Sequence, residues 1–229
     1  MATTAIVTGS GRGIGKATAI LLAKKGVNVV VCSRSLDEIN DTVKRIRSIS
    51  SKVLGVKCDV GVSLHVNNLV NKAIRTFGSI DILVNNAGIV FVRKLIDTTE
   101  EQWDQTLQSN LKSAFLCSKA VLPYMMYSNA GTIINVSSGA GKTGFENLSA
   151  YCASKFGMLG LTESLSWEVT SNIRIMAICP GEVATKMQEI DPEYYQSNKD
   201  RMLQPEQVAA KILEMIFDQR YRNGQIVDI

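Results

Sequence analysis

The chain has 229 residues and a net charge of +4, from 25 basic and 21 acidic side chains. Hydrophobic residues make up 45% and charged residues 20%, a balance typical of a globular domain and not of a disordered chain. Basic residues form no run with interleaved aromatics, which argues against nucleic-acid binding, and no stretch has the length of a membrane-spanning helix.

Short β-branched runs alternate with longer amphipathic stretches along the chain. The runs predict strands at Thr4–Val7, Asn28–Cys32, Lys52–Lys57, Ile80–Val84, Thr132–Val136, Arg174–Ile178 and Gln225–Asp228. The amphipathic stretches predict helices at Ile14–Lys25, Leu36–Ile49, Leu64–Phe77, Tyr151–Val169 and Pro205–Phe217. A further long helix is expected to open with a capping box, Thr98-x-x-Glu101, and to run past Phe115.

The pattern predicts one domain over residues 1–229. Strands that are apolar throughout, such as Val29–Val31, are typical of a parallel sheet with helices on both faces. Alternating strands and helices fit a barrel or an open sheet, and the glycine-rich first turn favours the open sheet. We therefore expect an α/β, Rossmann-type doubly wound fold with a seven-stranded parallel sheet.

Cysteine and histidine usage bears on location and metal binding. The five cysteines are scattered with no Cys-x-x-Cys pair, and the chain starts with a strand-like segment instead of a leader. Both features favour a cytoplasmic protein with reduced thiols. His65 is the single histidine and lies in a polar helical stretch, so we expect a surface role for it and no metal site.

The turn between the first strand and the first helix reads TGSGRGIG at positions 8–15. Gly9 permits the tight turn, Gly13 lets the backbone approach a pyrophosphate, and Gly15 lets the helix pack on the sheet. The phosphate would meet free N–H groups at the helix N-terminus. A glycine-rich run alone can be a flexible turn, but the strand before it and the helix after it indicate a dinucleotide site.

The end of the second strand bears on the choice of cofactor. An NAD-preferring site commonly ends this strand in a carboxylate that binds the ribose 2′-hydroxyl. Here the strand ends Cys32-Ser33-Arg34, so Arg34 can pair with a 2′-phosphate, and Arg12 can approach from the glycine turn. Both arginines can instead be solvated loop residues. We favour NADP(H).

Later motifs complete a set that is highly specific as a whole. NNAG occupies positions 85–88, Asn110 lies in the long helix, Ser137-Ser138 follows the fifth strand, YCASK spans 151–155, and PG at 180–181 precedes Thr185. In order and spacing these segments resemble the short-chain dehydrogenase/reductase family of the compact single-domain type. The resemblance covers almost the entire chain and is nearest to the 3-oxoacyl-acyl-carrier-protein reductases.

Four residues are the predicted catalytic set. Tyr151 and Lys155 are four apart on a helix, so they share one face, and we expect the ammonium to lower the pKa of the phenol. Tyr151 is then the proton donor. The resemblance implies that Lys155 also bonds the nicotinamide ribose, that Ser138 polarises the substrate carbonyl, and that Asn110 supports a helix kink and holds a water. Ser138 is preferred to Ser137 by its spacing from Tyr151.

The predicted cofactor contacts combine the glycine turn with the ends of the later strands. Asp59 can accept a bond from adenine or cap the next helix, and Asn86 can brace neighbouring strands. The resemblance implies that Thr185 contacts the nicotinamide carboxamide. The full predicted set is Gly9, Ser10, Arg12, Gly13, Ile14, Gly15, Ser33, Arg34, Asp59, Val60, Asn86, Ala87, Gly88, Tyr151, Lys155, Pro180, Gly181, Val183 and Thr185.

The resemblance implies an NADP(H)-dependent oxidoreductase that interconverts a carbonyl and a secondary alcohol, with a substrate lid over residues 186–204. The expected substrate is a small-molecule or acyl-thioester carbonyl, and an acyl carrier protein is a candidate partner. The chain is expected to form a homo-oligomer, either a dimer or a tetramer. No nucleic acid or membrane partner is expected. The alternatives are reduction or oxidation of a sugar, polyol, steroid or xenobiotic carbonyl, or a non-catalytic NADP(H) sensor. The intact catalytic set argues against the sensor.

Overall fold

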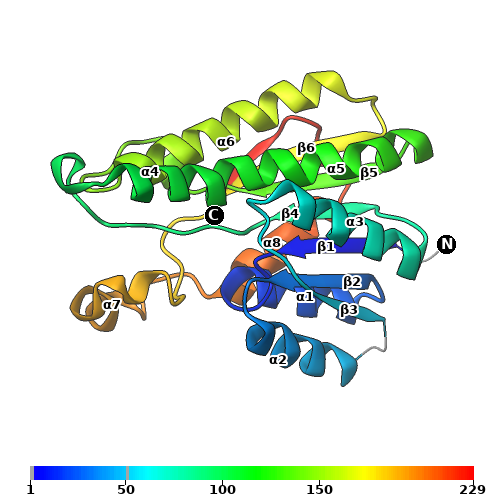
Figure 1. The fold of residues 1–229 in the computed structure, drawn as a ribbon, viewed down its shortest axis with the longest axis horizontal. Helices are drawn as coiled ribbons and strands as arrows, with labels where there is room; N and C mark the ends of the chain where they lie inside the picture. Colours follow the sequence, from blue (N-terminus) through cyan, green and yellow to red (C-terminus); the bar gives the residue numbers. More distant parts are fainter. Residues whose placement is uncertain (1–2, 50–51) are drawn as a thin grey trace.

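The computed structural model describes residues 3–49 and 52–229, and an open parallel sheet lies at their centre (Figure 1). Within these residues the sheet has seven strands in the order β3-β2-β1-β4-β5-β6-β7. They are β1 (Thr4–Thr8), β2 (Asn28–Ser33), β3 (Val53–Lys57), β4 (Ile82–Asn85), β5 (Gly131–Val136), β6 (Ile173–Cys179) and β7 (Ile226–Asp228). The predicted doubly wound fold is confirmed.

Helices cover both faces of the sheet (Figure 1). One face is covered by α1 (Gly13–Lys24), α2 (Leu36–Arg47) and α8 (Pro205–Phe217), whose apolar residues share one core cluster. The other face is covered by α3 (Ser63–Phe77), α5 (Ser113–Ser128) and α6 (Ser149–Glu168). The sheet and its two helix layers form a scaffold whose strands all end at one edge.

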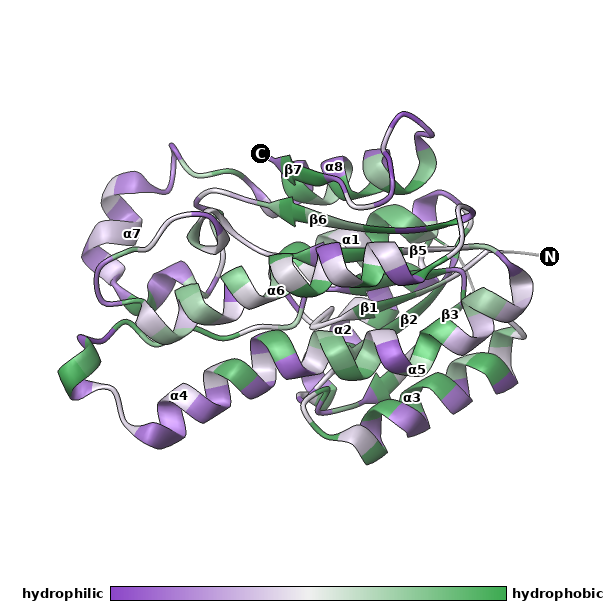
Figure 2. Cartoon of the chain, turned by 90° about the horizontal axis from the view of Figure 1, so that it is seen from above, coloured by the Kyte–Doolittle hydropathy of each residue, from purple (hydrophilic) through white to green (hydrophobic). Residues whose placement is uncertain are grey.

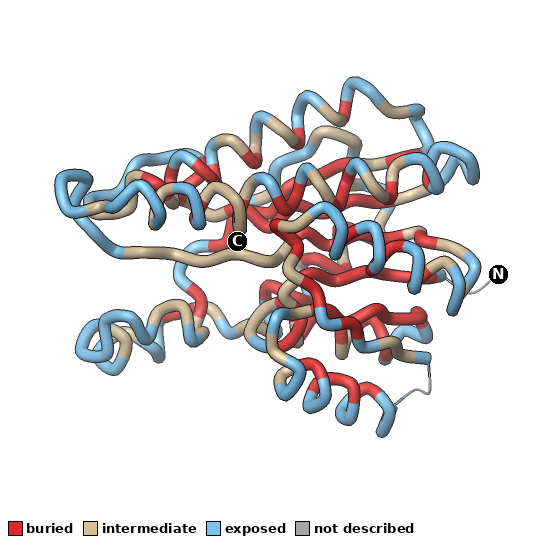
Figure 3. The backbone as a smooth tube through the Cα atoms, viewed as in Figure 1, coloured by how far each residue is buried: buried red, intermediate tan, exposed pale blue. Residues whose placement is uncertain are grey.

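Strand β1 shows why these strands are apolar at every position. Ala5 and Val7 pack into the core cluster beneath α1 and α8, while Ile6 packs into the cluster on the other face. Successive side chains of a strand point to opposite faces, so a strand covered on both sides buries all of them. Figure 2 shows the resulting hydrophobic strands inside the two layers, and Figure 3 shows them buried. All five cysteines are buried and unpaired as well.

The long helix predicted across Asn110 is divided into three parts. It begins with α4 (Glu100–Leu107), continues as a π-helix over Gln108–Lys112 and ends as α5. The capping box uses Thr99 and Gln102, so the prediction of Thr98 and Glu101 was one residue too early. The π-helical turn places an irregularity at Asn110, where the family resemblance implied a kink.

The segment predicted as a substrate lid leaves the sheet edge and returns to it. It contains a 3-10 turn (Gln188–Ile190) and the short helix α7 (Pro192–Asn198). Its two ends meet where Val183 pairs with Leu203 in an isolated parallel bridge. Figure 1 shows α7 standing apart from the helix layers, on the side where β1 and β2 end. The segment therefore has its own local structure and a fixed base.

Arg174 on β6 fastens the end of α8 to the sheet. Its guanidinium donates hydrogen bonds to the carbonyls of Met215, Ile216, Asp218 and Tyr221. The last carbonyls of a helix have no partner inside the helix, so this one side chain satisfies several of them. We infer that Arg174 stabilises the packing of α8.

Replacing Arg174 by methionine should lower the free energy of unfolding by about 2–3 kcal/mol, because partly buried carbonyls lose their donors. Urea denaturation followed by circular dichroism measures this change. Arg45→Met is the control, since the exposed pair Arg45–Asp41 should contribute less than about 0.5 kcal/mol. Equal losses in the two variants would contradict the assigned role.

Candidate active site

The carboxyl ends of the strands open into a cavity of about 400 Å³. It lies where the strand order reverses between β1 and β4, the usual position of ligand sites in open α/β sheets. Its walls come from the glycine turn, the strand ends, α6 and the start of the segment predicted as a lid. They include the predicted cofactor contacts Gly9, Arg12, Gly13, Ile14, Ser33, Arg34, Asp59, Val60, Asn86, Ala87, Gly88, Tyr151, Lys155 and Thr185.

The glycine turn forms a cradle that larger residues would fill. Gly9 and Gly13 have φ angles of +61° and +54°, which favour glycine. A Cβ added at Gly15 would lie 2.4 Å from the side-chain Nδ2 of Asn86 and 2.5 Å from the Gly9 carbonyl oxygen. The N-terminus of α1 has no side-chain cap within the described chain, so its N–H groups can bind an anion. This cradle fits the pyrophosphate of a dinucleotide.

Two of the predicted cofactor residues brace the cradle. The amide of Asn86 donates to the carbonyl oxygens of Thr8, at 2.9 Å, and Gly9, at 3.3 Å. Ser10 is buried away from the cavity: its hydroxyl donates to the Val7 carbonyl at 2.6 Å and accepts from the Cys32 N–H at 2.9 Å. Ser10 thus joins the ends of β1 and β2.

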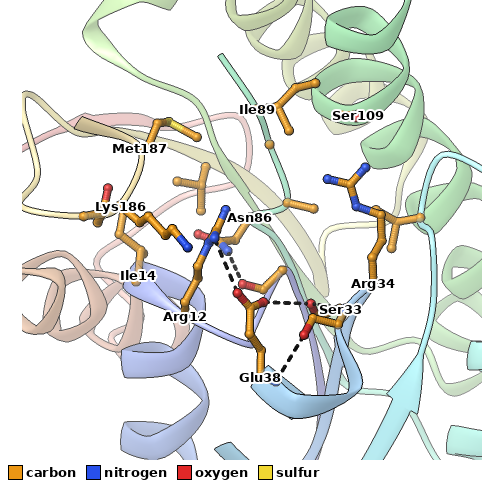
Figure 4. Close-up of a pocket in the computed structure, with 18 of the residues that line it drawn as sticks. Arg12, Ile14, Ser33, Arg34, Glu38, Asn86, Ile89, Ser109, Lys186 and Met187 are labelled. Carbon is orange, nitrogen blue, oxygen red and sulfur yellow. Dashed lines mark hydrogen bonds and ion pairs between the residues drawn. The ribbon is translucent and has the colours of Figure 1, made fainter. Parts of the chain in front are cut away.

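Four side chains lie at the end of β2, namely those of Arg12, Ser33, Arg34 and Glu38 (Figure 4). Arg12 and Arg34 come from opposite sides of this region, and the Arg34 guanidinium points away from Glu38, toward the side of Ser109 (Figure 4). Glu38, on the first turn of α2, forms an ion pair with Arg12 at 3.4 Å. Its sequence position looks like an ordinary acidic residue at a helix N-terminus, so sequence reasoning missed it.

Several further predicted contacts have structural partners. Asp59 lines the cavity, and its carboxylate accepts the Gly61 N–H at 2.9 Å, which stabilises the turn before α3. The Pro180 carbonyl accepts from Gly139, and the Gly181 N–H donates to the Ile229 carbonyl. Val183 is buried in the core. Pro180, Gly181 and Val183 therefore do not line the cavity and instead pack next to it.

The predicted catalytic residues converge at the end of β5. Lys155 is 4% exposed, and its ammonium donates to the Val136 carbonyl at 2.8 Å. The same nitrogen lies 5.5 Å from the centre of the Tyr151 ring. The Ser138 hydroxyl accepts the Ala140 N–H at 3.2 Å and is hydrogen-bonded to Tyr151, although Ser137 and not Ser138 lines the cavity. Tyr151 and Lys155 share a helix face, as the spacing predicted.

Burial governs the pKa values of this pair. It raises the pKa of Tyr151, while a hydrogen bond from Ser138 opposes the rise. It lowers the pKa of Lys155 to about 8. The lowered pKa expected for Tyr151 is therefore not found, because the cost of removing the phenolate from water outweighs the hydrogen bond from Ser138. At neutral pH the phenol keeps its proton.

Asn110 is fully buried next to Tyr151 and Lys155. Its amide nitrogen donates to the Ile89 carbonyl at 2.9 Å and to Ser154 Oγ at 3.0 Å, and its oxygen accepts the Ile89 N–H at 2.8 Å. A Cβ added at Gly88 would lie 3.2 Å from this oxygen and 3.9 Å from the Lys155 nitrogen. The π-helical turn thus places Asn110 against the same small residue as Lys155.

Two serines that support the catalytic pair were not predicted as site residues. The Ser137 hydroxyl donates to the Lys155 carbonyl at 3.0 Å. Ser154 accepts from Asn110 and donates to the Tyr151 carbonyl at 2.7 Å. Both bonds fix the backbone of α6 where the catalytic side chains leave it. Ser137 follows β5 and its partner lies in α6, so sequence spacing gave no signal for that bond, whereas the Ser154–Tyr151 bond lies within α6.

Comparison with known proteins assigns the class. The family model for short chain dehydrogenases matches residues 3–195. The chain belongs to this family of oxidoreductases. No helix in residues 3–49 and 52–229 is both long and apolar enough to cross a membrane. Across the same ranges, no group of three or more His, Cys, Asp or Glu side chains is arranged to hold a metal ion.

Particular relatives are similar over most of this chain. The 3-oxoacyl-acyl-carrier-protein reductase of Thermotoga maritima is 35% identical over 98% of this chain and 94% of its own. The dehydrogenase/reductase SDR family member 4 of Sus scrofa is 39% identical over 81% of this chain and 67% of its own. A solved actinorhodin polyketide ketoreductase with NADPH superposes with a TM-score of 0.94 at 30% identity, covering 100% of this chain and 95% of that one.

Alanine at Gly15 should disturb the cradle, because its Cβ would collide with the Gly9 backbone. We expect a loss of about 1–3 kcal/mol in the free energy of unfolding, as for other overpacked sites, and weaker dinucleotide binding. Gly160→Ala is the matched control, since a Cβ there meets no atom within 4 Å. Thermal unfolding and calorimetric titration measure both effects; an unchanged Gly15→Ala protein would contradict the close packing.

Proposed function

We propose that this protein is an NADP(H)-dependent reductase of acyl-thioester carbonyls, similar to the 3-oxoacyl-acyl-carrier-protein reductases. The observation that carries the proposal is the arrangement of buried Lys155 and half-buried Tyr151 at one end of a cavity with a dinucleotide cradle, with Ser138 next to Tyr151. The names of the near full-length relatives support a ketone or 3-oxoacyl substrate. Carbonyl reduction needs both a hydride source and a proton donor. In this proposal the glycine cradle binds the dinucleotide that carries the hydride, and Tyr151 is the proton donor.

The chain's own residues have distinct roles in this proposal. NADPH, when bound, supplies the hydride to the carbonyl carbon. Tyr151 donates its proton to the carbonyl oxygen, and its raised pKa keeps that proton available at neutral pH. Ser138 donates a hydrogen bond that orients and polarises the carbonyl. Lys155 places a positive charge near the developing phenolate, and Asn110 holds Ile89 and Ser154 in place next to this pair.

The proposed choice of NADP(H) rests on charge at the end of β2. Arg34 points into open space beside the cavity and, among the residues the structure describes, has no ion pair with a carboxylate. Arg12 approaches from the glycine turn. Two guanidinium groups favour a 2′-phosphate over a neutral hydroxyl. The NADPH in the actinorhodin ketoreductase complex is in line with this choice.

The segment 186–204 is proposed to be the substrate lid. Lys186 and Met187 line the cavity, while α7 stands farther out with an exposed Tyr194. The Tyr194 hydroxyl donates to Glu182 at 2.8 Å, which ties α7 to the base of the segment. An acyl carrier protein is the proposed donor, and the proposed setting is a cytoplasmic homo-oligomer. Sugar, polyol, steroid and xenobiotic carbonyls are the substrates to compare.

Absorbance of NADPH at 340 nm tests the proposal, with acetoacetyl thioesters compared against a panel of sugars and ketones. Turnover should be fastest with the thioester, and Tyr151→Phe should lower kcat by about 10²–10⁴-fold, as expected on loss of a general acid. Binding of NADPH should change less than about twofold. No turnover on any carbonyl, with NADPH bound, would overturn the reductase and favour the sensor.

The pH dependence of reduction provides a second test. The pKa of Lys155 is about 8, so its ammonium is present below that pH and is lost above it. The kcat/KM for NADPH, which reports groups of the free enzyme, should be flat near pH 6–7 and fall about tenfold per pH unit above 8. Activity must return when samples are brought back to pH 7. A flat profile up to pH 9.5 would contradict the role of the ammonium.

A further inference from the structure

A carboxylate already lies at the end of β2 where a 2′-phosphate would bind. Glu38 accepts a hydrogen bond from the Ser33 hydroxyl at 3.2 Å and pairs with the Arg12 guanidinium at 3.4 Å (Figure 4). Both partners line the cavity, and so does Glu38. Two of the groups that would recognise the phosphate, Arg12 and Ser33, are thus occupied by an acid of the chain itself.

The position of this carboxylate is built into the fold. Ser35 caps α2 by accepting the Glu38 N–H, which fixes the backbone of Glu38 over the glycine turn. A Cβ added at Gly11 would lie 2.6 Å from the Glu38 Cβ and 2.7 Å from its Oε2. Only glycine at position 11 leaves room for this side chain. Gly11 therefore admits Glu38 into the cavity wall.

The carboxylate is also displaceable. Its side chain is 33% exposed and that of Arg12 is 56% exposed, so the ion pair lies at the rim where water screens it. Glu38 can turn toward solvent without leaving a buried charge unpaired. The neighbouring Asp37 is exposed and does not line the cavity, so the acidic character of this turn alone does not produce the contact.

We propose that Glu38 is a specificity-determining residue that competes with the 2′-phosphate of NADP(H) for Arg12 and Ser33. The inference rests on the proposed NADP(H) function and deepens it. Phosphate and carboxylate are both anions, so NADP(H) binding has to displace Glu38 from its partners. The 2′-hydroxyl of NAD(H) is neutral and can donate a hydrogen bond to the same carboxylate. Glu38 thereby narrows the preference for NADP(H) that the two arginines create.

Calorimetric titration of NADP⁺ and NAD⁺ into the wild type and Glu38→Gln tests the proposal without any turnover. Glutamine keeps the size of the side chain and its bond from Ser33 but removes the charge. We expect NADP⁺ to bind about fivefold to tenfold more tightly, and NAD⁺ to change less than about twofold. Asp37→Asn is the matched control, because it makes the same change in net charge outside the cavity and should leave both affinities within about twofold.

A double-mutant cycle with Arg12→Met localises the effect. If Glu38 competes for Arg12, the gain from Glu38→Gln should shrink at least about twofold in the Arg12→Met background. Unchanged or weaker NADP⁺ binding by Glu38→Gln, with NADPH-dependent turnover intact, would overturn this inference and leave the proposed function standing. Absence of NADP⁺ binding by every variant and the wild type would instead overturn the proposed cofactor itself.

Discussion

The site depends on keeping one ammonium group buried at the junction of β5 and α6. Burial of an unpaired charge is costly, and the hydrogen bond from Lys155 to the Val136 carbonyl offsets part of that cost. The geometry leaves little freedom, because a Cβ at Gly141 would lie 2.8 Å from the Lys155 carbonyl and 2.5 Å from Ser137 Oγ. The end of β5 and the first turns of α6 are thus held together at the position of the catalytic pair.

The same burial sets the chemistry of Tyr151, one helical turn earlier. A phenol in a dry environment keeps its proton, which suits a group that gives a proton to a carbonyl oxygen. The reverse reaction would need the phenolate and is disfavoured by the same environment near neutral pH. The protonated form of Tyr151 is the one that the proposed reduction requires.

The fold and most of the site follow from local sequence patterns. Apolar strands, the TGSGRGIG turn and the YCASK segment each carry a short-range signal, so their placement was predicted well. The capping box was predicted one residue early because Thr98 and Thr99 are adjacent and each has a suitable residue three positions later. The position of Glu38 could not be predicted, since it depends on the packing of α2 against Gly11 in the turn between β1 and α1. The pKa of Tyr151 likewise depends on tertiary burial.

Transfer of isotope from the cofactor to the product tests the central claim most directly. The protein is incubated with NADPH deuterated at C4 of the nicotinamide and an acetoacetyl thioester, and the product is analysed by mass spectrometry and NMR. The proposal predicts a 3-hydroxyacyl thioester with deuterium on the carbon that bears the new hydroxyl, from one of the two C4 positions. Bound NADPH that passes no deuterium to this or any other carbonyl would contradict it.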